Sequence, residues 1–414
     1  MTLKTSTFSA DKRQVVIIGA GAAGFFSAIN LARRDPEVQI RILEKTGKLL
    51  SKVKISGGGR CNVTHHCFNN RELVQYYPRG HKELLQVFSQ FAVQDTIQWF
   101  RREGIELHTE ADGRMFPVTN NSQTIIDCFL NLAAELSIHI HTHCDVTGIQ
   151  KTETGLRLIT SKGNYEAETI ICATGGNHKP EFYRLFESLG HSIESPVPSL
   201  FTINLPNNSI RKVLQGLSVQ QAEVKVKGTK LHYEGPVLIT HWGLSGPAVL
   251  KLSAFAAKEF HQRQYRAEII VNWAHPLSGT EIESGLKALQ KQKPKASPYS
   301  HPQFAIPKRL WEYLCAQAGI PEDKPWAEIS NKLIMALVMQ IHQSTFAMEG
   351  KTTFKEEFVT CGGIQLKEVN FKTMESKLVP RLFFCGEVLN IDGITGGFNF
   401  QNAWSTAWIC AQHA

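Results

Sequence analysis

Short apolar runs alternate with stretches of helical periodicity in the first part of the chain. Gln14–Ile18 and Val38–Leu43 are short runs rich in β-branched residues, and between them Ala22–Arg34 repeats its apolar side chains every three or four positions. A strand, a helix and a strand in succession form a βαβ unit, which is typical of parallel sheets covered by helices. We therefore predict an α/β protein with a parallel, doubly wound sheet.

Further helices and a buried strand follow in the same part of the chain. His81–Glu103 and Ser122–Leu136 have the spacing of amphipathic helices, and the apolar run Thr169–Ala173 predicts a buried strand. The aromatic residues of these helices are expected in the core rather than against a ligand, because large apolar side chains are mostly buried.

The pattern changes after this first part. Prolines separate short alternating segments and predict a mostly β unit over residues 195–279, whereas helical periodicity dominates residues 280–345, most clearly in Ile329–Ile341. Strand-like runs and glycines then return. We expect residues 1–194 and 346–414 to form one Rossmann-like domain in two segments, interrupted by the β unit and the helical unit.

Composition narrows the class of protein. Hydrophobic residues make up 42% of the chain and charged residues 20%, as in globular proteins. The apolar runs are far shorter than the roughly 18 residues that span a bilayer, and the first residues lack the apolar segment of a secretory signal. Nine cysteines without a CxxC pair favour reduced thiols. We expect a cytoplasmic protein that does not enter a membrane.

A glycine motif precedes the first helix. GAGAAG at residues 19–24 follows a strand; Gly19 permits the tight turn, Gly21 lets the backbone approach a pyrophosphate, and Gly24 lets helix and strand pack closely. N–H groups at the start of the helix stabilise the phosphate charge. Glu44 ends the second strand, where a carboxylate can accept hydrogen bonds from ribose hydroxyls. With a strand before it, a helix after it and this acidic residue at the end of the next strand, the motif predicts a dinucleotide site.

Later glycine turns favour FAD over NAD as the dinucleotide. Thr174–Gly176 closes a strand, and Gly386–Glu387 follows a late strand, where flavoproteins of this fold bind the ribityl chain. The loop Asp392–Asn399 leads to a helix expected to begin near Gln401, whose N-terminus would stabilise negative charge on reduced flavin. A second GxGxxG is missing from the sequence, so NAD(P)H is expected only as a transient reductant.

The stretch KVKISGGGRCNVT at residues 52–64 places three glycines among serine, arginine and asparagine. Such a loop can wrap a polyanion or a flat ring with its backbone N–H groups. Because it follows Glu44 closely, we expect it near the same cofactor.

These motifs resemble those of the BaiN-like (YhiN-type) family of FAD-dependent flavoproteins. The resemblance also covers ATGG at 173–176, THWGLSGPAVL at 240–250, VTCGGI at 359–364, MESK at 374–377 and FCGEVLNIDGITGGFNFQNAW at 384–404. It implies a two-segment FAD domain with inserted units and an FAD-dependent oxidoreductase activity. The chain departs from the family at residues 49–51, where many members carry Gly and a basic residue, and at Asn390, where Asp is common.

The residues expected to hold FAD lie in these turns and beside them. They are Gly19, Gly21, Ala22, Ala23, Gly24, Glu44, Lys45, Lys52, Ser56, Gly57, Gly58, Gly59, Arg60, Cys61, Asn62, Val146, Ala173, Thr174, Gly175, Gly386, Glu387, Gly393, Gly396, Gly397, Phe398, Asn399 and Phe400.

Two residues are candidates for catalysis. Cys61 either donates a proton beside the flavin or simply fills its loop. His241, which the family match suggests faces the flavin pocket, either contacts substrate or belongs to a structural turn. Together with Cys61, the run His65-His66-Cys67 matches no common zinc spacing, so we predict no metal site.

The distribution of charged residues indicates what kind of partner the protein could bind. Lys and Arg exceed Asp and Glu by 45 − 37 = 8, and one stretch of the predicted helical unit has six basic residues and no acidic one: Lys287, Lys291, Lys293, Lys295, Lys308 and Arg309. It is either a solvated face or a track for a phosphate backbone. Some family members resemble ribosomal RNA dihydrouridine synthases, so uridine in ribosomal RNA is the leading expected substrate. The alternatives are a small-molecule enone such as a bile-acid-type steroid, and a flavin-containing redox or binding module without catalysis.

Overall fold

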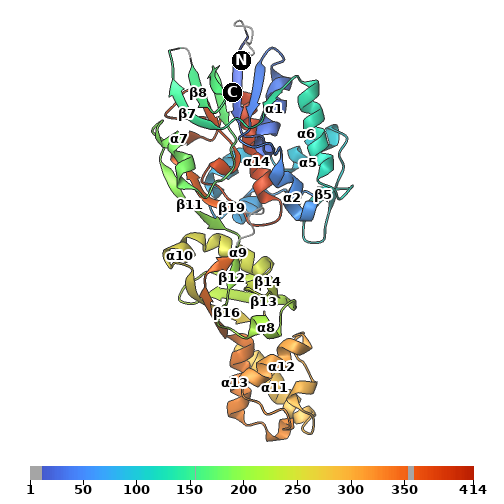
Figure 1. Cartoon of the computed structure of the whole chain (residues 1–414). Coiled ribbons are helices and arrows are strands. Elements are labelled where there is room, and N and C mark those ends of the chain that lie inside the picture. The colour runs from blue at the N-terminus through green and yellow to red at the C-terminus, as the bar shows by residue number, and fades with distance from the viewer. Residues whose placement is uncertain (1–11, 154, 353–358) are drawn as a thin grey trace. The chain divides into compact units, whose positions relative to one another are not determined.

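The computed structural model describes residues 12–153, 155–352 and 359–414 (Figure 1). They fall into two compact units, unit 1 within Met1–Pro198 and Lys355–Ala414, and unit 2 within Ser199–Phe354. In unit 2, residues from the expected β part and from the expected helical part, such as Val224 and Leu286, share one hydrophobic core.

Unit 1 is built on a seven-stranded sheet with the order β20-β21-β22-β10-β1-β2-β6. Its parallel strands are β1 (Gln14–Ile18), β2 (Gln39–Leu43), β6 (His139–His141), β10 (Thr169–Cys172) and β22 (Leu382–Phe384). In space, the third, second, first, fourth and fifth of these lie side by side, which is the Rossmann order. Because the fifth comes from the C-terminal segment, the predicted α/β class with a Rossmann-like domain in two segments is confirmed.

The helices of unit 1 bring the two ends of the chain into one core. Helices α1 (Ala22–Arg34) and α14 (Phe398–His413) pack together, with the ring centroids of Phe26 and Trp404 5.3 Å apart. The other helices are α2 (Ser51–Gly59), α3 (Asn70–Leu73), α4 (His81–Phe88), α5 (Val93–Arg102), α6 (Gln123–Glu135) and α7 (Arg184–Glu187).

The stretch predicted as helical over residues 81–103 is helical in the structure but is divided into two helices, α4 and α5. The Asp95 carboxylate accepts a hydrogen bond from the Ala92 N–H at 2.8 Å, which caps the start of a new helix. Phe91 and Val93 remain buried at the break. The apolar periodicity therefore continues across residues 89–92, although the helical backbone is interrupted there.

Smaller sheets complete unit 1. They are β3 (Thr64–His65), β5 (Arg114–Pro117) and β4 (Leu107–Thr109); β7 (Val146–Lys151), β8 (Leu156–Thr160) and β9 (Gly163–Ala167); and β11 (Ile193–Ser199) with β19 (Val359–Ile364). The short strands β20 (Val369–Asn370) and β21 (Glu375–Ser376) extend the main sheet.

Unit 2 has an antiparallel sheet with the order β17-β16-β13-β14-β15-β12-β18. Its strands are β12 (Thr202–Asn204), β13 (Ser218–Val226), β14 (His232–Ile239), β15 (Gly243–Ser245), β16 (Arg266–Asn272), β17 (Ser344–Glu349) and β18 (Lys351–Thr352). Its helices are α8 (Ile210–Val213), α9 (Pro247–Phe255), α10 (Ala257–Gln262), α11 (Gly279–Gln292), α12 (Lys308–Gln317) and α13 (Asn331–His342), and Figure 1 shows α11–α13 gathered together. Within the described residues of both units, every helix is too short or too polar to cross a membrane.

Candidate functional site

In the first glycine turn, two glycines have no room for a side chain and the third has. A Cβ at Gly24 would lie 1.9 Å from the Gly19 carbonyl oxygen, and a Cβ at Gly19 would lie 2.5 Å from the Ala173 carbonyl oxygen. Gly21 has no heavy atom within 4 Å of its Cβ position and is the residue immediately before α1. Backbone N–H groups at such a helix start are a ready site for a phosphate, so this turn fits the pyrophosphate of a dinucleotide.

The carboxylate at the end of β2 lies beside this turn. Glu44 accepts a hydrogen bond from the Ala20 N–H at 3.1 Å. Lys45 forms an ion pair of 2.9 Å with Asp145, which immediately precedes Val146. The structure thus brings Glu44, Lys45 and Val146 to the edge of the sheet where β1 and β2 end.

Two predicted cofactor residues from opposite ends of the sequence form an ion pair. The Lys52 ammonium lies 2.6 Å from the Glu387 carboxylate, which also accepts the Thr360 N–H at 2.8 Å. The neighbouring Gly386 has φ +74° and packs against α1, where its Cβ would lie 3.2 Å from that of Ala23. The turn at Gly386 is therefore packed against α1, the helix that follows the glycine turn at residues 19–24.

The loop from Ser56 to Asn62 has a backbone that only glycine adopts easily. The helical conformation of α2 is lost at Ser56, and Gly57, Gly58 and Gly59 all have φ between 59° and 84°. A Cβ at Gly57 would lie 2.7 Å from the Phe116 ring, whereas Gly58 has no heavy atom within 4 Å of its Cβ position. One face of the loop is therefore packed and the other is open, as a cradle for a flat or anionic ligand requires.

Arg60 and Cys61 have different surroundings within this loop. The Arg60 guanidinium lies 4.0 Å over the Phe116 ring and 2.6 Å from the Glu110 carboxylate. The Cys61 side chain is fully buried, and burial raises the pKa of its thiol to about 12, opposed by a hydrogen bond with Ser56. The role of Cys61 as a proton donor stays a prediction, and its burial favours the alternative that it fills the loop.

The last glycine loop closes on itself and on the Ser56–Asn62 loop. The Asn399 side chain accepts the Gly393 N–H at 2.8 Å and donates to the Gly393 carbonyl at 2.9 Å. The Asn62 amide, oriented to satisfy both neighbours, accepts the Gly397 N–H and donates to the Thr64 carbonyl, each at 3.0 Å. Helix α14 begins at Phe398, so its predicted start near Gln401 is wrong: Gly397 at φ +94° ends the turn earlier.

Two arrangements in this region were missed from the sequence. Asp392 is fully buried and paired with the nearly buried Arg79, 313 residues away in the chain. The ring of Phe398 stacks against those of His65 and Tyr76, with centroids 4.6 and 4.5 Å away, and the His65 and Tyr76 rings lie 5.8 Å from each other. His65 drew attention only as a metal ligand, yet the described residues contain no group of three or more His, Cys, Asp or Glu able to hold a metal.

Three oxygen atoms in the C-terminal segment are buried without a hydrogen-bond partner among the described residues. They belong to the side chains of Thr360, Asn390 and Asn402. Buried polar atoms usually have partners, so their presence beside Glu387 and the start of α14 is consistent with a polar ligand there. Asn390 is also one of the two places where the sequence departs from the family that it resembles.

The predicted catalytic residue His241 and the predicted basic run lie in unit 2. His241 is exposed, with its ring centroid 4.5 Å from that of Trp242. Lys287 and Lys308 form ion pairs with Glu283 and Glu312, at 2.6 and 3.8 Å. The exposed residues Lys291, Lys293 and Lys295 have no ion pair within the described parts of the chain, so this part of the basic run keeps its charge uncompensated.

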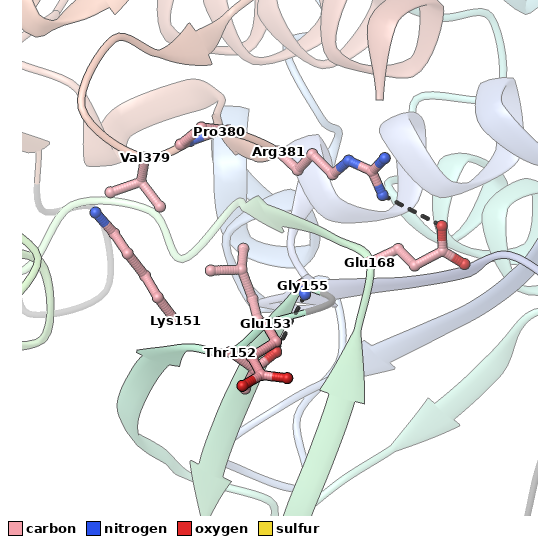
Figure 2. Close-up of a pocket in the computed structure, with 9 residues that line it drawn as sticks. Lys151, Thr152, Glu153, Gly155, Glu168, Val379, Pro380 and Arg381 are labelled. Carbon is pink, nitrogen blue, oxygen red and sulfur yellow. Dashed lines mark hydrogen bonds and ion pairs between the residues drawn. The ribbon is translucent and has the colours of Figure 1, made fainter.

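A hollow of about 320 Å³ lies elsewhere on unit 1 (Figure 2). Lys151 of β7 and Arg381, just before β22, contribute to its wall, and Arg381 is 3.3 Å from Glu168. Its lining includes none of the residues expected to hold FAD. The hollow is therefore not part of the candidate site.

Comparison with known proteins decides the family. The family described as HI0933-like protein Rossmann domain matches residues 13–413. The chain belongs to this family. This places it among FAD-dependent oxidoreductases, in agreement with the open Gly21, the Glu44 carboxylate and the convergence of the later glycine turns.

Relatives and solved structures cover nearly the whole chain. The ribosomal RNA dihydrouridine synthase of Escherichia coli is 29% identical over 97% of this chain and 98% of its own. The 3-dehydro-bile acid delta(4,6)-reductase of Clostridium scindens is 24% identical over 97% of this chain and 98% of its own. The 3-ketosteroid-delta4-(5alpha)-dehydrogenase of Rhodococcus jostii RHA1 has a TM-score of 0.50 at 14% identity over 99% of each chain, a likeness of fold.

Proposed function

We propose that this protein uses FAD to reduce uridine in ribosomal RNA to dihydrouridine. The observation that carries the proposal is the 29% identity over 97% of the chain to a ribosomal RNA dihydrouridine synthase. The uncompensated lysines Lys291, Lys293 and Lys295 support it, because exposed cations without carboxylate partners suit a phosphate backbone.

The proposed reaction assigns a task to each part of the site. Bound FAD, once reduced by an external donor, would supply the hydride for C6 of the uracil C5–C6 bond. The Gly21 N–H at the start of α1 would hold the pyrophosphate, Glu44 would accept hydrogen bonds from the ribose hydroxyls, and the N-terminus of α14 would stabilise negative charge near the flavin ring. C5 also needs a proton; the sequence suggests Cys61 or His241 as its donor, and the burial of the Cys61 thiol favours packing over proton transfer for that residue.

The proposed external donor is NAD(P)H, binding transiently. The chain has a single GxGxxG motif, at residues 19–24, which is assigned to FAD. Stopped-flow absorbance of the oxidised protein mixed with NADH or NADPH tests this point. We expect rapid bleaching of the flavin with at least one of them, and no bleaching with either would exclude both donors.

Nucleoside mass spectrometry of ribosomal RNA tests the substrate. We expect a strain without the gene to lose a dihydrouridine that returns with the wild-type gene. It should not return with Gly21→Val, a matched control chosen to block FAD binding. An unchanged set of dihydrouridines in the deletion strain would overturn the RNA proposal.

A steroid enone is the second candidate substrate. It rests on the 24% identity over 97% of the chain to the bile acid reductase. The same hydride and proton additions would saturate a conjugated C=C bond of a small molecule. Purified protein with NAD(P)H and a panel of steroid enones would then consume reductant, and the absence of consumption would reject this candidate.

A further inference from the structure

The turn that connects β14 to β15 in unit 2 is rigid. The Thr240 hydroxyl oxygen accepts the N–H groups of Trp242 and Gly243 at 3.3 and 3.2 Å, and the Trp242 carbonyl accepts the Leu205 N–H at 2.9 Å. Gly243 has φ +155°, and a Cβ there would lie 2.2 Å from the Ile203 carbonyl oxygen. Backbone groups and the Thr240 hydroxyl therefore fix the turn, without help from the rings of His241 and Trp242.

This rigid turn holds an aromatic pair in solvent. Trp242 is 44% exposed and lies beside the exposed His241, whereas Trp273, Trp311 and Trp326 of the same unit are fully buried. A tryptophan kept at the surface on a fixed backbone has no part in the core of unit 2. It is instead preorganised to stack on a flat partner.

One guanidinium group is bonded to the backbone of this pair, and a second is bonded to the same short helix, α8. Arg211 of α8 donates to the carbonyl oxygens of His241 at 3.2 Å and Pro206 at 2.6 Å, and Arg309 of α12 donates to the carbonyl of Val213, also on α8. Neither arginine has a carboxylate within ion-pair distance among residues 12–153, 155–352 and 359–414. Both charges therefore stay uncompensated by a described carboxylate, Arg211 at the His241 backbone and Arg309 at the end of α8.

We propose that Trp242 is a stacking platform for an unpaired base of RNA and that Arg211 and Arg309 contact its phosphates. The proposal rests on the proposed function and names where the RNA is held. Single-stranded RNA is recognised by bases stacked on aromatic rings while cations follow the backbone. An apolar protein partner would fit the ring but not two uncompensated guanidiniums, so charge complementarity favours RNA.

The test measures binding of an oligouridylate of about 12 nucleotides to the FAD-loaded full chain across a range of salt concentrations. Trp242→Ala should weaken binding about 5- to 150-fold at every salt concentration, with the salt slope unchanged, and Trp242→Phe should recover most of the loss. Arg211→Gln and Arg309→Gln should each lower the slope of log affinity against log salt by about 0.7. Met339→Ala, which removes a side chain 48% exposed on α13, is the control for loss of exposed apolar surface.

Three results would overturn the proposal: unchanged binding by Trp242→Ala, a loss equal to that of Met339→Ala, or a changed oligomeric state with unchanged RNA affinity. The last would identify the ring as a contact for protein. The proposed function is tested separately, by measuring the dihydrouridines in ribosomal RNA of the deletion strain. If they disappear but Trp242→Ala restores them fully and binds RNA normally, the function stands and the platform is rejected.

Discussion

In unit 1 the candidate site is assembled from both ends of the chain, whereas in unit 2 the candidate surface comes from residues closer in sequence. Lys52 and Glu387, which form an ion pair in unit 1, are 335 positions apart. Arg211 and the carbonyl of His241, which are hydrogen-bonded in unit 2, are 30 positions apart. The flavin site therefore requires the two segments of unit 1 to fold together, while the surface of unit 2 needs only the inserted segment.

The two regions also differ in how their charged side chains are paired. In unit 1, Asp392 is buried and neutralised by Arg79, and Glu387 is engaged by Lys52. In the described part of unit 2, Arg211 and Arg309 donate to carbonyl oxygens and have no carboxylate partner. Substitutions in unit 1 should consequently change cofactor retention or stability, and substitutions on the surface of unit 2 should change RNA affinity at constant flavin content.

The largest expected effect is the loss of FAD from Gly21→Val. Gly21 has φ −94° and no heavy atom within 4 Å of its Cβ position, so the chain tolerates a side chain there while the pyrophosphate does not. We expect a folded protein without FAD, measured by circular dichroism and by flavin absorbance after gel filtration.

Gly24→Val is the matched comparison for this prediction. Its Cβ would lie 1.9 Å from the Gly19 carbonyl oxygen, so we expect it to disrupt the fold rather than only the cofactor site. A yellow, fully loaded Gly21→Val protein would contradict the assignment of this turn to FAD.

The local parts of this site were predictable from sequence because short-range patterns encode them. Gln14–Ile18 and Ala22–Arg34 have the predicted bounds, and the glycine spacing alone gives the roles of Gly19 and Gly24. The pairing of Arg79 with Asp392 was not predictable, because no periodicity links residues 313 positions apart. The hydrogen bond between Asn62 and Gly397 is likewise a product of tertiary folding.

The next effect in size concerns the buried ion pair of unit 1. Asp392→Asn leaves the Arg79 guanidinium without its carboxylate in a nearly buried position, which should lower the free energy of unfolding by about 3–5 kcal/mol. Urea denaturation followed by fluorescence measures the change. Glu166→Gln, which breaks the exposed pair with Arg157, is the control and should cost about 0–1 kcal/mol. Equal losses for the two variants would contradict the view that burial gives the Asp392 pair its importance.

A smaller effect is expected from the basic run of unit 2. Replacing Lys291, Lys293 and Lys295 together with glutamine should lower the salt slope of RNA binding by about 0.7 for each phosphate that the protein no longer neutralises, with no change in flavin content. Lys287→Gln should change the slope less, because Glu283 already lies 2.6 Å from that ammonium. An unaltered slope in the triple variant would remove these lysines from the RNA-binding surface.

The smallest effect is expected from Cys61→Ala, which tests whether a residue of the flavin loop acts in chemistry or in packing. The thiol is fully buried, and its pKa is raised to about 12, so it stays protonated near neutral pH and is a weak acid for a proton transfer. We expect dihydrouridine formation to change less than about threefold and the free energy of unfolding to fall by about 1 kcal/mol, the scale of one small buried group. Removal of a true general acid would instead slow the reaction about 10²–10⁴-fold with FAD still bound and reducible. That result would establish Cys61 as the proton donor and would require its loop to open during turnover.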